Sequence, residues 1–264
     1  GGLIQILEQM GVSGRLVRTS LYRLVQDGGF EASKSGRKSY YSLTPVGGRR
    51  FRLATERIYG RPRDDWQGEW LMVLVPPGKG DQRDSLRKEL GWMGFGSLST
   101  GLMGRPVGAA PELEEFLAEQ SPPPIAYRAR LLDSTSPELL EEMIRNSWKL
   151  GETEQGYQRF IKCFAPLLDA ASNSANLPGE VSLLLRVLLV HEYRRILLRD
   201  PQLPAALLPQ NWHGQLAYEL CRDLYGALLG ASEEYVSAAL VTQSGPLPPP
   251  GSGFFSRFGG LNPA

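Results

Sequence analysis

Basic and polar side chains recur near the start of the chain, at a spacing that suits contact with a nucleic-acid duplex. One set follows steps of four, three and four, which places it on one face of a helix: Arg15, Thr19, Tyr22 and Gln26. Arg18 and Arg23 flank this face. Arginine and glutamine can hydrogen-bond to base edges in a major groove, and arginine and threonine also bind phosphate oxygens. The spacing therefore favours a helix that faces a groove.

A second group of cations follows directly. Lys34, Arg37 and Lys38 lie in a five-residue loop with a glycine, between short strand-like runs at 30–33 and 39–43. Lysine and arginine bind phosphates, which gives affinity without sequence preference. We therefore expect a basic hairpin whose loop holds the duplex backbone. Tyr40, on the second strand, completes the predicted DNA-contacting set.

Capping and turn residues mark the elements that must carry these side chains. Ser13 can cap the helix because its hydroxyl can accept an unpaired backbone N–H of the first turn. Asp27-Gly28-Gly29 ends the helix, and Thr44-Pro45 opens the next one. The apolar stripe of the first helix consists of Leu16, Val17, Leu21, Leu24 and Val25. Helix, glycine turn and basic hairpin follow in the order of a winged helix-turn-helix.

The charge distribution agrees with this interpretation. Residues 1–63 hold 12 Lys or Arg and 4 acidic side chains, a net charge of +8. The remaining chain has 17 basic and 24 acidic side chains, a net charge of −7, so the overall charge is only +1. A cationic head on an anionic body is expected of a DNA-binding module joined to a module with another role.

Two stretches carry a family resemblance. VRTSLYRLV at 17–25 with GRKSYYSLT at 36–44, and HEYRRILLRDP at 191–201 with the leucine–proline run before Trp212, resemble the PaaX family. These are bacterial repressors of phenylacetic acid catabolism. The resemblance runs from the first residues to about Val241. Family members carry a further N-terminal helical segment before this point, so we expect part of the winged-helix core to be uncovered in the present chain.

The resemblance implies a cytoplasmic transcriptional repressor of phenylacetate and other aromatic catabolism genes. It implies a homodimer bound to a double-stranded DNA operator, with phenylacetyl-CoA, an acyl-CoA effector, releasing it; no cofactor is implied. Such an effector needs an apolar slot for its aryl group and cations for its phosphates. The candidate residues for this are Tyr193, Arg194, Arg195, Arg199 and Trp212. The alternative is a packed helix end with surface ion pairs, because cations there also complement the helix dipole.

The rest of the chain predicts an α+β protein in several parts. We expect a winged helix-turn-helix with a connector helix over 1–63, and a ferredoxin-like α/β domain used for dimerisation over 64–150. Helices over 151–243 are a possible effector-binding domain. The proline- and glycine-rich residues 244–264 predict a disordered tail, with Phe254, Phe255 and Phe258 exposed.

The middle part raises an alternative function. In the family it is similar to the CRISPR-associated nuclease fold, and such nucleases place an aspartate at the end of the first strand to hold a metal ion. Here that strand, Trp70 to Val75, is followed by two prolines, and the nearest aspartate is Asp81. We therefore expect no enzyme activity. A metal-dependent nuclease and a non-catalytic interaction scaffold are the alternatives to the repressor.

The remaining reactive residue types show no catalytic or metal-binding pattern. Cys163 and Cys221 lie far apart without metal-ligand spacing, and we expect two reduced, partly buried thiols. His191 and His213 are expected to be structural. The most apolar stretch, Val181 to Val190, is interrupted by a charge and is too short for a bilayer, so no membrane partner is expected.

Overall fold

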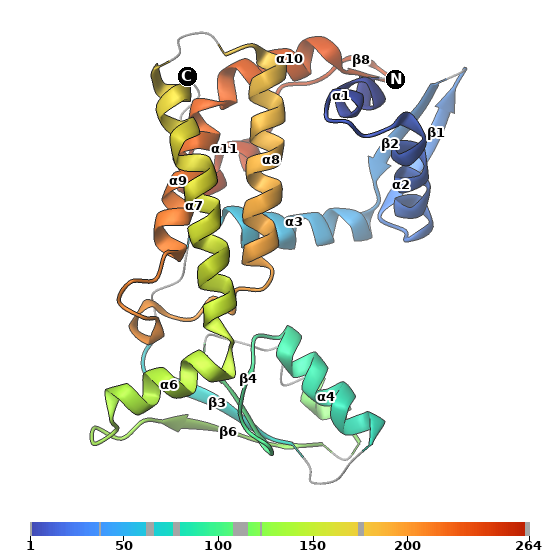
Figure 1. Ribbon diagram of the computed structural model, residues 1–264. Helices are drawn as coiled ribbons and strands as arrows, with labels where there is room; N and C mark the ends of the chain where they lie inside the picture. The colour runs from blue at the N-terminus through green and yellow to red at the C-terminus, as the bar shows by residue number, and fades with distance from the viewer. Residues whose placement is uncertain are drawn as a thin grey trace. The chain divides into compact units, whose positions relative to one another are not determined.

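The computed structural model describes residues 2–36, 38–61, 66–75, 80–107, 116–121, 123–173 and 177–261. The chain divides into two compact units. The first comprises Gly1–Arg61, Ile161–Arg194 and Tyr218–Ala264, and the second comprises Pro62–Phe160 and Arg195–Ala217. Both helices and sheets are present (Figure 1), as the predicted α+β class requires. None of the described helices is long and apolar enough to cross a membrane.

The first unit begins with helices and a two-stranded hairpin. The order is α1 (Gly2–Gln9), α2 (Gly14–Gln26), β1 (Phe30–Ser35), β2 (Lys38–Leu43) and α3 (Pro45–Tyr59). β1 and β2 are antiparallel. The strands extend further than predicted, because Lys34, Ser35 and Lys38 belong to them rather than to a five-residue loop. The turn is correspondingly tight, and Gly36 adopts a left-handed φ of 59° there.

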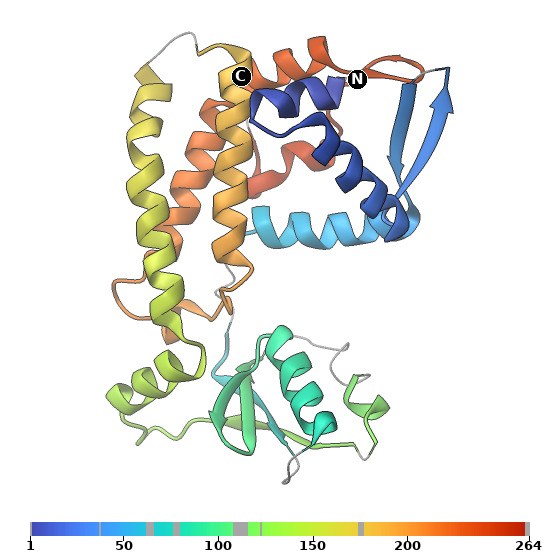
Figure 2. The same cartoon turned by 45° about the vertical axis from the view of Figure 1, so that its right-hand side comes forward.

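Long helices make up most of the remaining first unit. They are α7 (Leu150–Asn173), α8 (Gly179–Leu197), α9 (Gly214–Ala227) and α10 (Leu229–Ala239), and the first three also contribute residues to the second unit. Their fully buried side chains include Leu189, Cys221, Leu224 and Leu228. α3 runs from the hairpin towards α8 and α9 (Figures 1 and 2).

The C-terminal segment is ordered, so the prediction of a disordered tail is wrong for 244–261. It forms β7 (Val241–Thr242), β8 (Gly245–Pro246), α11 (Ser252–Phe255) and the 3-10 turn η2 (Arg257–Gly259). Phe258 is buried and not exposed as expected, and Leu261 is buried as well. The burial of these two apolar side chains stabilises a segment whose composition alone does not predict order. Residues 262–264 lie outside the described residues.

The second unit contains a four-stranded antiparallel sheet in the order β4-β5-β3-β6. The strands are β3 (Glu69–Leu74), β4 (Gly96–Ser99), β5 (Leu102–Pro106) and β6 (Ile125–Arg130). The first strand in sequence is central, which is the order of a ferredoxin-like layer. Between β4 and β5 the chain turns back at Thr100 and Gly101, so these two strands form a hairpin.

Helices cover both faces of this sheet. α4 (Asp81–Trp92) and the helical residues 116–119 pack on one face, where Val73, Leu90 and Phe95 form the core. α6 (Pro137–Ser147) and the 3-10 turn η1 (Ala205–Leu207) pack on the other, around a tryptophan-rich cluster. That second cluster includes Trp66, Trp70, Trp148 and Trp212.

Candidate nucleic-acid interface

Helix α2 begins as the sequence predicts. Ser13 has an extended backbone, and its hydroxyl accepts the N–H of Leu16 at 3.3 Å. The apolar stripe is less buried than predicted: Val17 is 3% exposed, but Leu16 is 55% exposed and Leu24 is also exposed. α2 therefore anchors to its unit mainly through one narrow line of contact and leaves most of its circumference accessible.

The predicted duplex-contacting side chains of α2 are all exposed. They are Arg15, Arg18, Thr19, Tyr22, Arg23 and Gln26. Thr19 is only partly available, because its hydroxyl donates to the Arg15 carbonyl at 3.0 Å. Tyr22 is 65% exposed, so its ring and hydroxyl can reach a partner. The face therefore offers guanidinium, amide and phenol groups without any rearrangement of the helix.

The turn after α2 locks this helix to the hairpin and to α3. The Thr44 hydroxyl caps α3 by accepting the Gly47 N–H at 2.9 Å, and it donates to the Gly28 carbonyl at 2.6 Å. The Thr44 N–H donates to the Gly29 carbonyl at 3.1 Å. Gly47 approaches so closely that an added Cβ would lie 1.9 Å from the Gly29 oxygen. The three elements therefore meet in a rigid joint that fixes their mutual orientation.

The hairpin presents its lysines on two faces. Lys34 pairs with Ser39 and Lys38 pairs with Ser35, so the two lysines alternate to opposite faces. Both are exposed, whereas Tyr40 is half-buried and shares the face of Lys38. Arg37 lies outside the described residues. A hairpin with cations on both faces can contact the two phosphate backbones that border a groove.

The predicted effector residues lie at the C-terminal end of α8 and in the segment that follows it. Tyr193 and Arg194 belong to the first unit, and Arg195, Arg199 and Trp212 to the second. Tyr193 is 3% exposed, and Trp212 packs edge-on against Tyr157 at 5.7 Å between ring centroids. The three arginines are exposed. The structure therefore brings Trp212 into a protein core rather than into an open slot.

Sequence reasoning missed several polar contacts within the second unit. The Tyr157 hydroxyl donates to the buried carboxylate of Asp200, which also accepts the Gln202 N–H at 2.6 Å. His213 contacts Glu154 through its ring and donates its backbone N–H at 3.1 Å. His213 is therefore structural, as predicted. Asp200 is followed by Pro201, and this proline is the one signal in the sequence that places the carboxylate in a turn.

The described residues offer no group of three or more His, Cys, Asp or Glu side chains placed to hold a metal ion. β3 ends at Leu74 without a carboxylate, and Asp81 is the first residue of α4. The two cysteines are unpaired; Cys163 is exposed and Cys221 is buried. Burial raises the pKa of the Cys221 thiol, which therefore stays protonated at neutral pH.

Comparison with known proteins defines the class of this molecule. Three family models match it: PaaX-like protein over residues 1–47, the PaaX protein central Cas2-like domain over 63–138, and the PaaX-like protein C-terminal domain over 148–238. The chain is 36% identical over 265 residues to the transcriptional repressor PaaX of Escherichia coli K12. That match covers 99% of this chain and 84% of the relative.

A solved structure is also similar. The uncharacterized protein Rv0674 from Mycobacterium tuberculosis matches with a TM-score of 0.59 and 25% sequence identity, over 88% of this chain and 89% of that one. These matches define a transcriptional regulator with a Cas2-like central domain and a helical C-terminal domain. The chain belongs to the PaaX family, and the relative from Escherichia coli is described as a transcriptional repressor.

Proposed function

We propose that this protein is a repressor that binds a double-stranded DNA operator through a winged helix-turn-helix formed by α1 to α3. In this proposal α2 enters the major groove and the β1–β2 hairpin contacts phosphates. The observation that carries it is the pair of exposed polar surfaces, on α2 and on the hairpin, joined by the rigid turn at Thr44 and Gly47. Base contacts from α2 give sequence preference, and the lysines with Arg37 give affinity.

The proposed repressor acts as a homodimer in the cytoplasm, on genes of phenylacetate and other aromatic catabolism. The central domain offers a surface for a second copy. Leu74 pairs with Ile125, so both side chains lie on one face of the sheet, and Tyr127 lies two residues along. All three are exposed, and Ile125 is 67% exposed. β6 is also an edge strand. Exposed apolar side chains beside an edge strand favour pairing with another chain.

We further propose that phenylacetyl-CoA releases the repressor, with residues 151–243 as the effector-binding part and residues 64–150 as the pairing part. The resemblance of 191–201 and of the run before Trp212 supports this effector. Among the candidate residues, the exposed side chains of Arg194 and Arg199 can meet phosphates directly. Tyr193 and Trp212 would contribute through packing, because both are held within their units.

Fluorescence anisotropy on a labelled duplex from upstream of an aromatic-catabolism operon tests this function. The full chain is titrated at fixed salt, with phenylacetyl-CoA, free CoA and free phenylacetate added in separate series. We expect specific binding that only phenylacetyl-CoA relieves. Binding that ignores all three compounds would remove the effector. Metal-dependent cleavage of the duplex would favour the nuclease, and the lack of both binding and cleavage would favour the scaffold.

A further inference from the structure

The C-terminal segment holds one buried anchor. Phe258 is 2% exposed, and its ring contacts Tyr59 of α3 at 5.1 Å, Tyr225 of α9 at 5.4 Å and Tyr218 of α9 at 5.8 Å between centroids. Its φ of 55° lies in the left-handed region, which costs a bulky residue about 1–2 kcal/mol. Such a conformation persists only where the surroundings enforce it. The aromatic contacts of this ring supply that enforcement.

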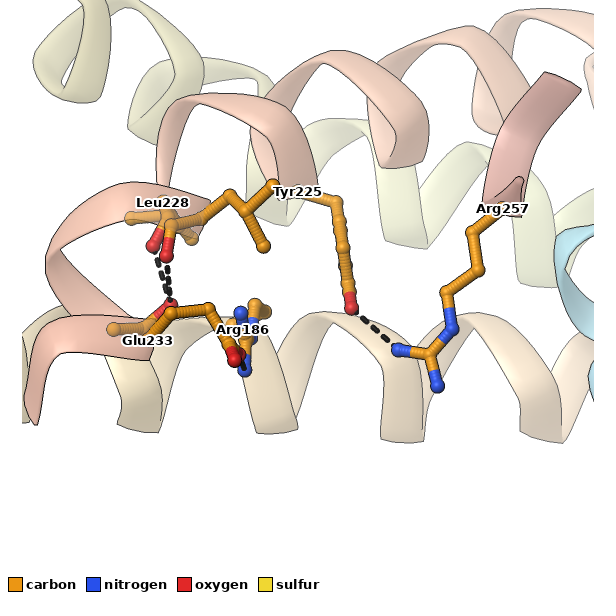
Figure 3. A network of polar contacts seen from close by, with 7 residues as sticks. Arg186, Tyr225, Leu228, Glu233 and Arg257 are labelled. Atoms are coloured by element: carbon orange, nitrogen blue, oxygen red, sulfur yellow. Dashed lines mark hydrogen bonds and ion pairs between the residues drawn. The ribbon is translucent and has the colours of Figure 1, made fainter. Parts of the chain in front are cut away.

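The neighbouring arginine ties the same elements together. Arg257 donates to the Tyr225 hydroxyl at 2.7 Å, and its guanidinium lies 4.5 Å from the Tyr59 ring centroid. Figure 3 shows Tyr225 between Arg257 and the ion pair of Arg186 with Glu233, and the Arg186 guanidinium lies 5.3 Å from the Tyr225 centroid. Burial raises the pKa of Tyr59 to about 12, so its ring remains a neutral partner for the cation.

The other end of the segment contacts the hairpin. The Ser33 hydroxyl on β1 donates to the side-chain carbonyl of Gln243 at 3.3 Å, and Gln243 lies in the turn between β7 and β8. Ser33 pairs with Tyr40, so this contact is on the face that also carries Lys38. Nearby, the Tyr235 hydroxyl of α10 donates to Gln9 of α1 at 3.1 Å. The segment therefore touches the predicted DNA-binding part at two places far apart in the chain, the hairpin and the end of α3.

We propose that residues 241–261 form a strap that positions the DNA-binding elements, with Phe258 and Gln243 as positioning residues. This inference rests on the proposed DNA-binding function. Phe258 fixes the end of α3 against α9, and Gln243 holds the side of the hairpin. Because the joint at Thr44 and Gly47 makes α2, the hairpin and α3 one rigid body, fixing α3 at its far end fixes the orientation of α2.

Orientation matters because a dimer must present two reading helices at a set spacing. If α2 samples many orientations, only a fraction of the molecules can bind the operator at any moment. The apparent operator affinity falls in proportion to that fraction. Loss of the strap should therefore reduce operator affinity without removing any DNA-contacting side chain. The number of phosphate contacts, and with it the salt slope, should remain unchanged.

The test compares Phe258→Ala with Phe255→Ala, which removes a half-buried ring on the same segment that packs on Phe254. Spin labels on Ser35→Cys and His191→Cys, both exposed positions, report the hairpin-to-α8 distance in a Cys163→Ser background. We expect one narrow distance distribution for the parent and for Phe255→Ala, a broad one for Phe258→Ala, and partial recovery in Phe258→Leu. Operator affinity should fall about tenfold for Phe258→Ala, in parallel with the loss of the competent orientation.

An unchanged distance distribution in Phe258→Ala, or a broadened one with unchanged operator affinity, would overturn the strap. If circular dichroism shows that Phe258→Ala is unfolded, two other variants decide: Phe258→Leu and Gln243→Ala, which changes an exposed turn. Their spin-label distance distributions and operator affinities are measured in the same way. Both should broaden the distribution, and unaltered behaviour in both would refute the inference. If the parent chain binds no duplex, the proposed function fails, while the distance measurement still decides whether the segment holds the hairpin.

Discussion

The hairpin lysines allow a quantitative test of the proposed interface. Lys34 and Lys38 lie on opposite faces, so they should contact different phosphates, and replacing both with alanine should remove two independent contacts. Each phosphate contact contributes about 0.9 to the slope of log affinity against log salt. The double variant should therefore lose about 1.8 from that slope, and each single variant about half as much.

The consequence is large enough to measure by anisotropy. Raising salt from about 50 to about 200 mM should weaken the parent about 12-fold more than the double variant, since a fourfold change in salt is raised to the power of about 1.8. Operator and unrelated duplexes should lose affinity equally, because phosphates carry no sequence. Arg37→Ala combined with Lys38→Ala should behave in the same way.

Lys162→Ala is the matched control, because Lys162 is an exposed lysine on α7, away from the hairpin in the chain. Its slope should equal that of the parent. A double variant with an unchanged slope would show that the hairpin lysines do not contact phosphates. A loss confined to the operator duplex would contradict the division between phosphate-binding hairpin and base-reading helix.

Three further predictions concern the joint, the dimer surface and the thiols. Gly47→Ala should destabilise the first unit by several kcal/mol in denaturant unfolding, because its Cβ would collide with the Gly29 backbone. A Cβ at Gly48 would meet the Arg52 side chain at 3.8 Å, an ordinary contact, so Gly48→Ala should be neutral or stabilising by about 0.5–1 kcal/mol. Equal effects would refute the tight joint. Ile125→Glu should shift the protein to monomer in sedimentation without lowering its melting temperature. A dimer that persists in this variant would show that dimerisation does not use this surface. Cys163 should react with a thiol reagent in the native protein, and Cys221 only after unfolding. Fast reaction of both thiols in the native protein would contradict the burial of Cys221.

Local signals allowed much of the first unit to be predicted from the sequence. Ser13, the glycine pair at 28–29 and the Thr44-Pro45 step each act within a few residues, so the bounds of α2 and the start of α3 could be predicted from the chain alone. The alternation of strands and helices also predicted a ferredoxin-like layer in the second unit, but not the order of its strands. The hairpin at Thr100 and Gly101 was missed, because the short strands around it carry glycines and little alternation.

Features that depend on packing between distant parts of the chain could not be predicted from the sequence. The C-terminal segment is proline- and glycine-rich, so its composition predicted disorder, yet Phe258 and Leu261 are buried. Phe258 packs against α3 and α9, which are distant in sequence. Leu16 and Leu24 fit an apolar stripe by periodicity and are nonetheless exposed. The spacing of apolar residues predicts which of them share a face of the helix, whereas their burial depends on whether another element covers that face.

In the proposed repressor, α2 reads the DNA sequence and the hairpin supplies affinity. The most direct measurement is the ratio of operator to unrelated-duplex affinity for the parent, for Arg15→Ala with Gln26→Ala, and for Lys34→Ala with Lys38→Ala, by anisotropy at one salt concentration. The account predicts that the α2 variant loses most of this ratio, about 1–3 kcal/mol for each base contact removed, and that the hairpin variant keeps it. A ratio that survives the α2 changes, or collapses with the hairpin changes, would contradict the account.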